Sequence, residues 1–328
     1  MAKVGVIGGG AWGTALAVTA ARAGHDVTLW AREAEVVAAV NDTHVNSLFL
    51  PEVKLDPAIV ATGDLAVVST CELILLVPPA QHLRAVATAI KPHLTPTIPL
   101  IICAKGIELS TCALMTDVVA DVLPGAPRLV LSGPTFAKDV ALGLPTAVTL
   151  ATDQIELGRG IAERLASPGF RPYVSSDPVG VEVAGAAKNV FAIGCGIADG
   201  KGFGANARAA LLTRGLAELV RLAVACGGKP ETLMGLAGLG DLVLTATSMQ
   251  SRNYSLGVAL GQGKTLAEVL GARRSVTEGV TTAGALVALA ERKKVEMPIA
   301  AAMNRVLNQN ASIDDELKRL LDRPIKDE

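Results

Sequence analysis

Short, continuous apolar runs recur along the first half of the chain, and longer amphipathic stretches separate them. The runs are rich in Val, Ile and Leu and stop at glycine, proline or charged residues. Strands buried on both faces of a sheet have this continuous pattern. It therefore predicts an α/β domain with helices on both faces of a parallel sheet. The predicted strands are residues 4–7, 27–30, 73–77, 100–103, 129–131 and 146–150, and the helices between them include 81–90 and 112–123.

The pattern changes after Asp177-Pro178, where long stretches rich in Ala, Leu and Gly replace the short runs. These stretches have helical character, and we predict no strand among them. We therefore expect two domains, residues 1–180 with the sheet and residues 181–328 entirely helical. The tail after Ala311 is short and charged. The helices expected in the second domain are 179–198, 205–226, 256–261, 280–293 and 299–308.

A glycine-rich turn follows the first predicted strand and precedes a predicted helix. Gly8, Gly10 and Gly13 have the G-x-G-x-x-G spacing of dinucleotide-binding folds. Gly8 permits the tight turn, Gly10 lets a pyrophosphate approach the backbone, and Gly13 lets the helix pack against the strand. The N–H groups at the start of the helix would attract the phosphates. The order of strand, glycines and helix predicts a Rossmann-type dinucleotide site, and the alternative is a tight turn without a ligand.

The overall charge gives no reason to expect a polyanionic partner. The chain has 30 Lys and Arg against 31 Asp and Glu, a net charge of −1. Neither nucleic acid nor an anionic membrane surface is therefore favoured as a partner. An anionic substrate would need a local cationic pocket.

The cysteines indicate a reducing compartment. Five scattered cysteines form no C-x-x-C motif and no cluster with metal-ligand spacing, so we expect small core residues and no metal site. The chain starts with a core strand instead of a signal peptide, and Lys188 interrupts the long apolar stretch 183–198. We therefore expect a cytoplasmic protein without a membrane span.

Several candidate ligand-binding residues follow predicted strands, where open α/β sheets bind their ligands. Trp12 lies in the glycine turn, and Lys105 follows the fourth predicted strand as a cation near the expected phosphate crevice. Arg32 follows the second strand, where an arginine would accept the 2′-phosphate of NADP. Glu33 could instead face the ribose hydroxyl, so the choice between NADP and NAD stays open. Solvated surface side chains are the alternative for both cations.

Lys188 is the most informative single charge. Its neighbours in the stretch 183–193 are small or apolar on nearly every side, apart from Asn189. Burial lowers the pKa of a lysine, which makes it a usable general base near neutral pH. The usual alternative is a lysine whose head group reaches the solvent. Asn189 could orient a substrate hydroxyl.

A second polar cluster lies between residues 238 and 253. Asp241 and Thr245 are four residues apart, so a helix would place them on one face. Ser251, Arg252 and Asn253 combine a planar cation with hydroxyl and amide donors, a combination that suits a phosphate. The alternative is a helix cap followed by a polar loop.

Together these segments resemble the bacterial NAD(P)-dependent glycerol-3-phosphate dehydrogenases over essentially the whole chain. The glycine fingerprint is common to many dehydrogenases, and the later motifs in this order are far more specific. The motifs are Gly8-Gly-Gly-Ala-Trp-Gly13, Val77-Pro-Pro, Ala104-Lys-Gly-Ile107, Leu131-Ser-Gly-Pro-Thr-Phe-Ala137, Gly185-Ala-Ala-Lys-Asn-Val190, Gly238-Leu-Gly-Asp-Leu242, Ser251-Arg-Asn253 and Val276-Thr-Glu-Gly279.

The resemblance implies a Rossmann domain followed by an all-α domain like that of 6-phosphogluconate dehydrogenase. It also implies Lys188 as the proton acceptor, with Lys105 and Asp241 as further catalytic residues. Ala11 replaces a serine of many members, which removes one hydrogen bond to the pyrophosphate, and Thr135 replaces another serine. The implied cofactor contacts are Gly8, Gly10, Ala11, Trp12, Gly13, Arg32, Lys105, Ala137, Arg252, Val276 and Glu278. The implied substrate contacts are Lys105, Gly133, Thr135, Lys188, Asp241, Ser251, Arg252 and Asn253.

The activity implied by the resemblance is the interconversion of dihydroxyacetone phosphate and sn-glycerol 3-phosphate by hydride transfer with NADP or NAD, which feeds phospholipid synthesis. The apolar, helix-rich second domain is compatible with a homodimer. Two alternatives stay open on the residues alone. One is an oxidoreductase acting on a hydroxy acid or sugar acid, and the other is a dinucleotide sensor without catalysis.

Overall fold

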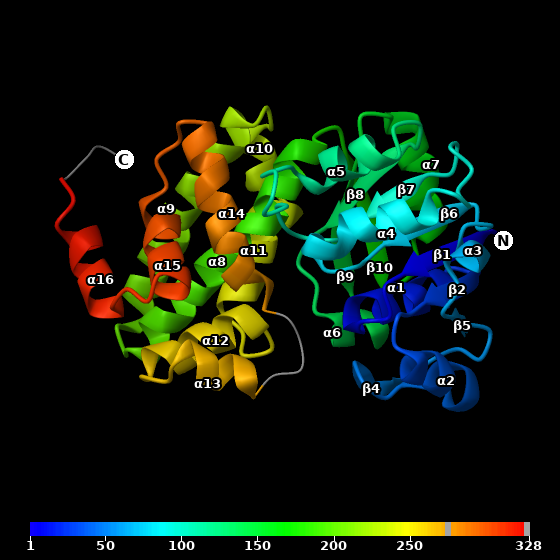
Figure 1. Cartoon of the computed structure of the whole chain (residues 1–328), viewed down its shortest axis with the longest axis horizontal. Helices are drawn as coiled ribbons and strands as arrows, with labels where there is room; N and C mark the ends of the chain where they lie inside the picture. Colours follow the sequence, from blue (N-terminus) through cyan, green and yellow to red (C-terminus); the bar gives the residue numbers. More distant parts are fainter. Residues whose placement is uncertain (273–276, 325–328) are drawn as a thin grey trace. The chain divides into compact units, whose positions relative to one another are not determined.

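The computed structural model describes residues 1–272 and 277–324, and the chain divides into two compact units (Figure 1). The first unit comprises Met1–Lys105 and Ala113–Glu182, and the second comprises Gly106–Cys112 and Val183–Glu328. The short segment Gly106–Cys112 therefore groups with the second unit although sheet strands precede and follow it in the sequence.

The first unit is built on an eight-stranded sheet with the strand order β10-β9-β8-β7-β6-β1-β2-β5. All six predicted strands are present in it. Neighbouring strands are parallel everywhere except between β8 and β9. The strands are β1 (Lys3–Ile7), β2 (Asp26–Trp30), β5 (Val60–Thr62), β6 (Leu73–Leu76), β7 (Leu100–Ile102), β8 (Arg128–Ser132), β9 (Thr146–Ala151) and β10 (Phe170–Ser175).

The antiparallel pair β8 and β9 corrects the prediction of an entirely parallel sheet. The helix between them, α6 (Ala137–Ala141), has five residues and is about 7.5 Å long, whereas a strand of this kind spans about 17 Å. Because α6 is too short to return the chain across the sheet, β9 runs back beside β8. The prediction also missed β5, β10 and the hairpin of β3 (Val45–Asn46) and β4 (Leu50–Lys54). β10 was missed because buried, half-buried and exposed positions are mixed along it.

Both faces of the sheet are covered, as the apolar runs predicted. On β6, Leu73 and Leu75 belong to one buried cluster, and Ile74 and Leu76 belong to the other. Alternate side chains of a strand point to opposite faces, so each cluster is the core under one helical layer. The helices of this unit are α1 (Ala11–Arg22), α2 (Ala34–Thr43), α3 (Leu65–Val68), α4 (Leu83–Ile90), α5 (Met115–Val122), α6 and α7 (Ile155–Leu165).

The described part of the second unit contains helices and no strand, as predicted. Four expected helices agree with the structure to within two residues at each end, whereas α12 begins four residues earlier than expected. Four helices were not predicted, namely α10, α11, α13 and α16, the last of which is formed by the charged tail. The helices are α8 (Pro178–Gly200), α9 (Gly204–Ala225), α10 (Pro230–Leu233), α11 (Asp241–Ala246), α12 (Arg252–Gly261), α13 (Leu266–Gly271), α14 (Glu278–Arg292), α15 (Pro298–Asn308) and α16 (Ile313–Leu321).

Helix α8 forms the core of the second unit. Its 18-residue apolar window is wholly buried, and it is the one described helix long and apolar enough to cross a membrane. A buried core helix meets the same criteria of length and composition, and the burial of α8 assigns it to the protein interior. The five cysteines are free thiols, and burial raises the pKa of Cys195 on this helix to about 12.

Helices α8 and α12 cross with their backbones in contact. A Cβ atom at Gly196 would lie 2.1 Å from the carbonyl oxygen of Tyr254, and one at Gly257 would lie 2.1 Å from that of Ile193. Close to this crossing, Asp199 of α8 accepts hydrogen bonds from Tyr254 Oη at 2.5 Å and from Arg208 Nη1 at 2.7 Å. The crossing therefore fixes where the N-terminus of α12 lies along the axis of α8.

Gly196→Ala should lower the free energy of unfolding by about 3 kcal/mol or more, because the added methyl meets rigid backbone. Gly160→Ala is the matched control, since Gly160 is an exposed position of α7 whose Cβ would meet nothing within 4 Å. That change should stabilise the protein by about 0.5–1 kcal/mol. Urea unfolding of both variants measures the difference. Equal free energies of unfolding for the two variants would contradict the close backbone contact between α8 and α12.

A buried carboxylate on α9 caps α15. Glu218 is 2% exposed and accepts hydrogen bonds from the backbone N–H groups of Ile299 at 2.8 Å and Ala300 at 3.1 Å. Burial raises the pKa of Glu218 to about 7, and these two N–H groups and the charges of Arg221 and Arg323 oppose that rise. The folded protein therefore holds this proton more tightly than the unfolded chain does.

Glu218→Gln should flatten the dependence of stability on pH. Because the folded pKa is raised from 4.5 to about 7, this group stabilises the fold below pH 4.5 and loses its contribution as the pH rises through 7. The loss in the wild type is on the order of 3 kcal/mol, and glutamine cannot ionise. Unfolding measured from pH 5 to 8 tests this, with Glu163→Gln at an exposed position of α7 as the control. Burial also raises the pKa of Glu182 to about 7, so some slope should remain.

Candidate active site

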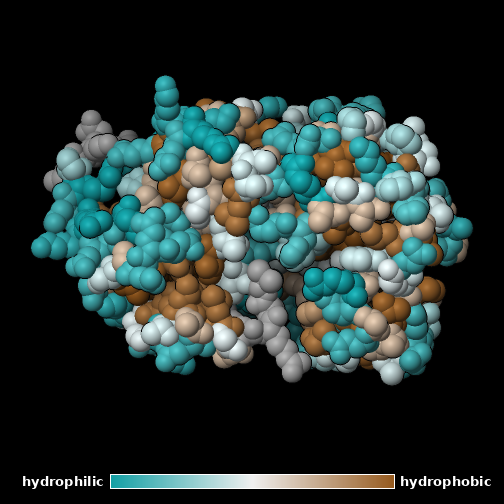
Figure 2. All heavy atoms as spheres, in the orientation of Figure 1, coloured by the Kyte–Doolittle hydropathy of each residue, from teal (hydrophilic) through white to brown (hydrophobic). Residues whose placement is uncertain are grey.

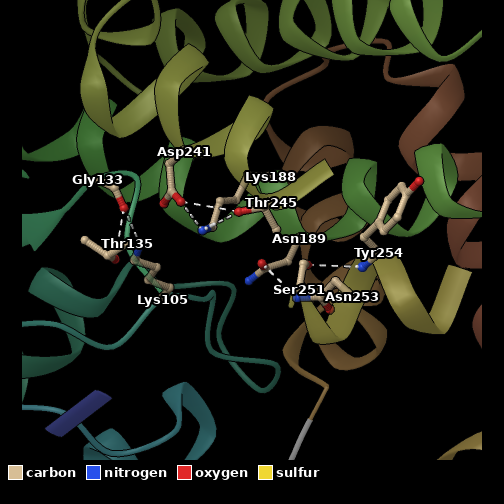
Figure 3. A network of polar contacts seen from close by, with 10 residues as sticks. All are labelled: Lys105, Gly133, Thr135, Lys188, Asn189, Asp241, Thr245, Ser251, Asn253 and Tyr254. Carbon is tan, nitrogen blue, oxygen red and sulfur yellow. Dashed lines mark hydrogen bonds and ion pairs between the residues drawn. The ribbon is translucent and has the colours of Figure 1, made fainter. Parts of the chain in front are cut away.

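The candidate site in the second unit is centred on a buried ion pair (Figure 3). Lys188 of α8 donates hydrogen bonds through Nζ to Asp241 Oδ1 and, at 2.9 Å, to Thr245 Oγ1. Asp241 and Thr245 lie one turn apart on α11, and their own contact is 3.3 Å. The prediction that one helical face presents both residues is therefore confirmed.

The burial expected of Lys188 is also confirmed, and its polar partners come from outside its apolar sequence neighbourhood. Its side chain is 8% exposed, and that of Asp241 is fully buried. The sequence around Lys188 is apolar, and the carboxylate comes from a segment 53 residues away. A buried ammonium is far less costly beside a hydrogen-bonded carboxylate than alone, so this pair holds a positive charge at a defined position.

The chain approaches Asp241 through an unusual turn. The π-helical segment η2 (Leu236–Gly240) ends where α11 begins, and such segments are frequent at functional sites. A Cβ at Gly238 would lie 2.1 Å from the carbonyl oxygen of Leu233. A glycine is therefore required for the backbone approach that delivers Asp241 to Lys188.

Asn189, the residue after Lys188, belongs to a network of buried amide groups. Asn253 donates through Nδ2 to Asn189 Oδ1 at 2.9 Å, and its Oδ1 accepts the backbone N–H of Gly279 at 3.1 Å. Since a backbone N–H can only donate, these contacts determine the orientation of both amide groups. The network joins α8, α12 and α14 around Asn253.

The alternative prediction for residues 251–253, a helix cap followed by a polar loop, is confirmed for the cap, which is Ser251. Its Oγ accepts the backbone N–H of Tyr254 at 3.2 Å and caps α12. Arg252, the first residue of α12, is exposed, whereas Ser251 and Asn253 are buried. Glu278 begins α14 and is half-buried, and Val276 lies outside the described residues.

In the first unit, three predicted residues meet at the carboxyl ends of β7 and β8 (Figure 3). Lys105 Nζ lies 3.4 Å from the carbonyl oxygen of Gly133, which Thr135 Oγ1 also contacts at 3.2 Å. Gly133 has a φ of +153°, and a Cβ there would lie 2.9 Å from Val148 Cα. The loop after β8 is therefore held against β9, with a lysine beside it. Ala137 begins α6 just beyond this loop.

The glycine turn has the shape of a pyrophosphate cradle. Gly8 has a φ of +133°, and a Cβ at Gly13 would lie 1.8 Å from the carbonyl oxygen of Gly8. A Cβ at Gly10 would instead meet nothing within 4 Å. Helix α1 has neither a side-chain cap nor an acidic residue in its first turn, so its N-terminal dipole is not neutralised there.

Trp12 and Arg32 also suit a ligand. The indole N–H of Trp12 is buried and has no hydrogen-bond partner among the described residues. The side chain of Arg32 is 75% exposed and pairs with Glu33 at 2.9 Å, so the two residues that bear on NADP or NAD preference lie together after β2. The open backbone at Gly10, the N-terminus of α1 and this indole fit a dinucleotide.

Asn46 is the residue that the sequence analysis overlooked. It is fully buried in β3, and its side chain contacts the glycine turn through Gly9. No motif or periodicity marks this asparagine, because its partners in the glycine turn and α1 are 37 and 32 residues away.

Comparison with known proteins identifies relatives along nearly the whole chain. The family model for the NAD-dependent glycerol-3-phosphate dehydrogenase N-terminus matches residues 3–157, and the model for the C-terminus matches residues 177–318. Glycerol-3-phosphate dehydrogenase [NAD(P)+] of Caulobacter vibrioides is 57% identical over 326 residues, which cover 99% of this chain and 98% of the relative. The enzyme of the same name from Rhodospirillum rubrum is 57% identical over 324 residues, covering 98% and 93%.

A solved structure gives the same result. The crystal structure of glycerol-3-phosphate dehydrogenase from Coxiella burnetii superposes with a TM-score of 0.94 at 40% identity. The match covers 98% of this chain and 99% of that chain.

Asp241→Asn should destabilise the protein by about 3–5 kcal/mol, because it leaves a buried ammonium without its counter-charge. Thr245→Val should cost less, about 1–3 kcal/mol, since it removes one neutral partner. Urea unfolding measures both changes. In a Lys188→Met background the cost of Asp241→Asn should shrink, and an undiminished cost would show that the pair is not the source of the effect.

Proposed function

The chain belongs to the NAD-dependent glycerol-3-phosphate dehydrogenase family, and on that premise we propose that it interconverts dihydroxyacetone phosphate and sn-glycerol 3-phosphate with NAD(P)(H). The observation that carries the proposal is the buried ammonium of Lys188, held by Asp241 and Thr245. A reaction at a secondary alcohol or ketone needs a group that moves one proton, and this lysine can do so away from bulk water.

Lys188 acts on the oxygen at C2. In reduction, its ammonium donates a hydrogen bond to the ketone oxygen and then the proton, and its charge stabilises the developing alkoxide. In oxidation, the neutral amine accepts the proton of the hydroxyl. Asp241 stabilises the ammonium and orients it, so the donor is in place before the substrate binds. Lys105 adds a second positive charge for the same oxygen.

The dinucleotide, when bound, supplies or accepts the hydride at C2. We assign its pyrophosphate to Gly8, Gly10 and Gly13, where the backbone is open and α1 begins. The further contacts implied by the family motifs are Ala11, Trp12, Arg32, Lys105, Ala137, Arg252, Val276 and Glu278. The exposure of Arg32 supports NADP as one of the accepted cofactors, since an arginine after β2 can meet a 2′-phosphate.

The substrate is held by residues of both units in this proposal. Lys105, Gly133 and Thr135 come from the first unit, and Ser251, Arg252 and Asn253 come from the second. Arg252 at the N-terminus of α12 suits a phosphate, because a guanidinium forms paired hydrogen bonds with its oxygens. Holding the phosphate fixes the position of C2 for the reaction, which is an orientation effect.

The remaining assignments concern the cellular setting. The free, mostly buried cysteines support a reducing cytoplasm, and the product would supply glycerophospholipid synthesis. Figure 2 shows hydrophobic residues scattered on the surface among hydrophilic ones. In the second unit Val224, Met234 and Met249 are at least half exposed, and the homodimer stays a prediction from the apolar, helix-rich character of this unit.

The direct test is oxidation of NADPH, and in parallel of NADH, by the purified protein with dihydroxyacetone phosphate, followed by the absorbance of the reduced nicotinamide. We expect turnover with this substrate and little with dihydroxyacetone, which lacks the phosphate. Turnover of 2-keto acids without turnover of dihydroxyacetone phosphate would replace this proposal with a hydroxy-acid dehydrogenase.

Lys188→Ala should lower kcat by about 10²–10⁴-fold or more, because no other group is assigned to move the proton. NADPH binding, measured by its fluorescence, should persist. Lys201→Ala is the matched control, a lysine just after α8 that pairs with Asp314 in a largely exposed setting. A near-normal kcat in the Lys188→Ala variant would show that Lys188 is not the proton-transfer group.

Arg252→Ala should raise the KM for dihydroxyacetone phosphate by about 10–100-fold, the loss expected for a charge-assisted hydrogen bond. Arg214→Ala, on an exposed position of α9, should leave the KM unchanged. An unchanged KM in the Arg252 variant would contradict its assignment to the phosphate.

A further inference from the structure

Asn46 is buried completely although its side chain is a polar amide, and it makes three hydrogen bonds, to the glycine turn, to helix α1 and to the loop between β3 and β4. Its Nδ2 donates to the carbonyl oxygen of Gly9 at 2.8 Å and to Thr14 Oγ1 at 2.8 Å. Its Oδ1 accepts the backbone N–H of Phe49 at 3.1 Å. Because the Phe49 N–H must donate and the Gly9 carbonyl must accept, the orientation of the amide is unambiguous.

The contact with Gly9 lies in the part of the turn where the residue types restrict the backbone least. Gly8, Gly9 and Gly10 are consecutive, and glycine restricts its own backbone less than any other residue does. The peptide group between Gly9 and Gly10 therefore has no side chain on either residue to set its orientation. The carbonyl of Gly9 is held instead by the amide of Asn46.

Holding this carbonyl also orients an N–H group. The described chain contains no cis peptide bond, and in a trans peptide the C=O and the following N–H point in opposite directions. When the Gly9 carbonyl points toward buried Asn46, the N–H of Gly10 points away from it. Gly10 is the glycine at which a Cβ would meet nothing within 4 Å, so its surroundings leave room for a ligand.

We infer that Asn46 is a positioning residue for the cofactor, because it holds the Gly9–Gly10 peptide with its N–H directed to the pyrophosphate site. This inference rests on the proposed function only in that it takes the ligand to be NAD(P)(H). Asn46 does not contact the ligand and acts through the backbone of the turn. The β3–β4 hairpin, otherwise outside the sheet, thereby supports the glycine turn.

The test compares NADPH dissociation constants from fluorescence titration with melting temperatures. Asn46→Ala and the shape-preserving Asn46→Leu should each weaken NADPH binding by about tenfold or more, since the turn loses the donor that orients it. Thr14→Val removes the other partner of Nδ2 and leaves the contact with Gly9, so it should lower the melting temperature and change binding by less than about twofold.

Asn41→Ala is a further control. Asn41 makes a similar amide bridge in the same unit, to the carbonyl oxygen of Ala61 at 3.0 Å and its N–H at 2.8 Å, and does not contact the turn. It should leave NADPH affinity unchanged.

Folded Asn46 variants with wild-type affinity would overturn the inference, and so would an equal loss of affinity in Thr14→Val. If Asn46→Ala does not fold, Asn46→Leu decides the question, because it retains the volume of the side chain. A wild-type protein that binds neither NADPH nor NADH would contradict the proposed function itself, which is a different result from an unaffected Asn46 variant.

Discussion

The structure of the site depends on one constraint, which is that a lysine ammonium is kept out of water. Lys188 lies on the most deeply buried helix of the second unit, and such a charge is tolerable only with a close counter-charge. Asp241 supplies it, and the π-helical turn and Gly238 allow its backbone to come near. The group that we propose for proton transfer is therefore positioned by the same contacts that make its burial possible.

Close packing of backbone against backbone positions the other parts of the site. Glycines let α12 touch α8, which sets the position of Ser251, Arg252 and Asn253 along the lysine helix. At the proposed dinucleotide site, glycines let α1 approach β1 and leave open space beside Gly10. The Gly9–Gly10 peptide carries no side chain that would orient it, and in our inference Asn46 restrains it through the Gly9 carbonyl.

Much of the fold was predictable because burial leaves a local pattern. Continuous apolar runs identified the six strands of the sheet core, and helical patterns identified α8, α9, α14 and α15. The errors have physical causes. Antiparallel β9 follows from a helix too short to cross the sheet, and β10 mixes buried and exposed positions. Helix α16 was missed because it has no buried apolar residue to give a helical pattern. Its one buried residue is Glu316, which pairs with Arg305 of α15.

The sequence by itself determined which backbone positions had to be free of side chains and which charge would be buried. The spacing of Gly8, Gly10 and Gly13 and the apolar surroundings of Lys188 are local properties, which any reader of the chain can find. Only the tertiary structure decided which groups meet that charge and that turn. Asp241 is 53 residues from Lys188, and Asn46 is 37 residues from Gly9. A hydrogen bond leaves no periodicity in the sequence when packing alone brings its two partners together.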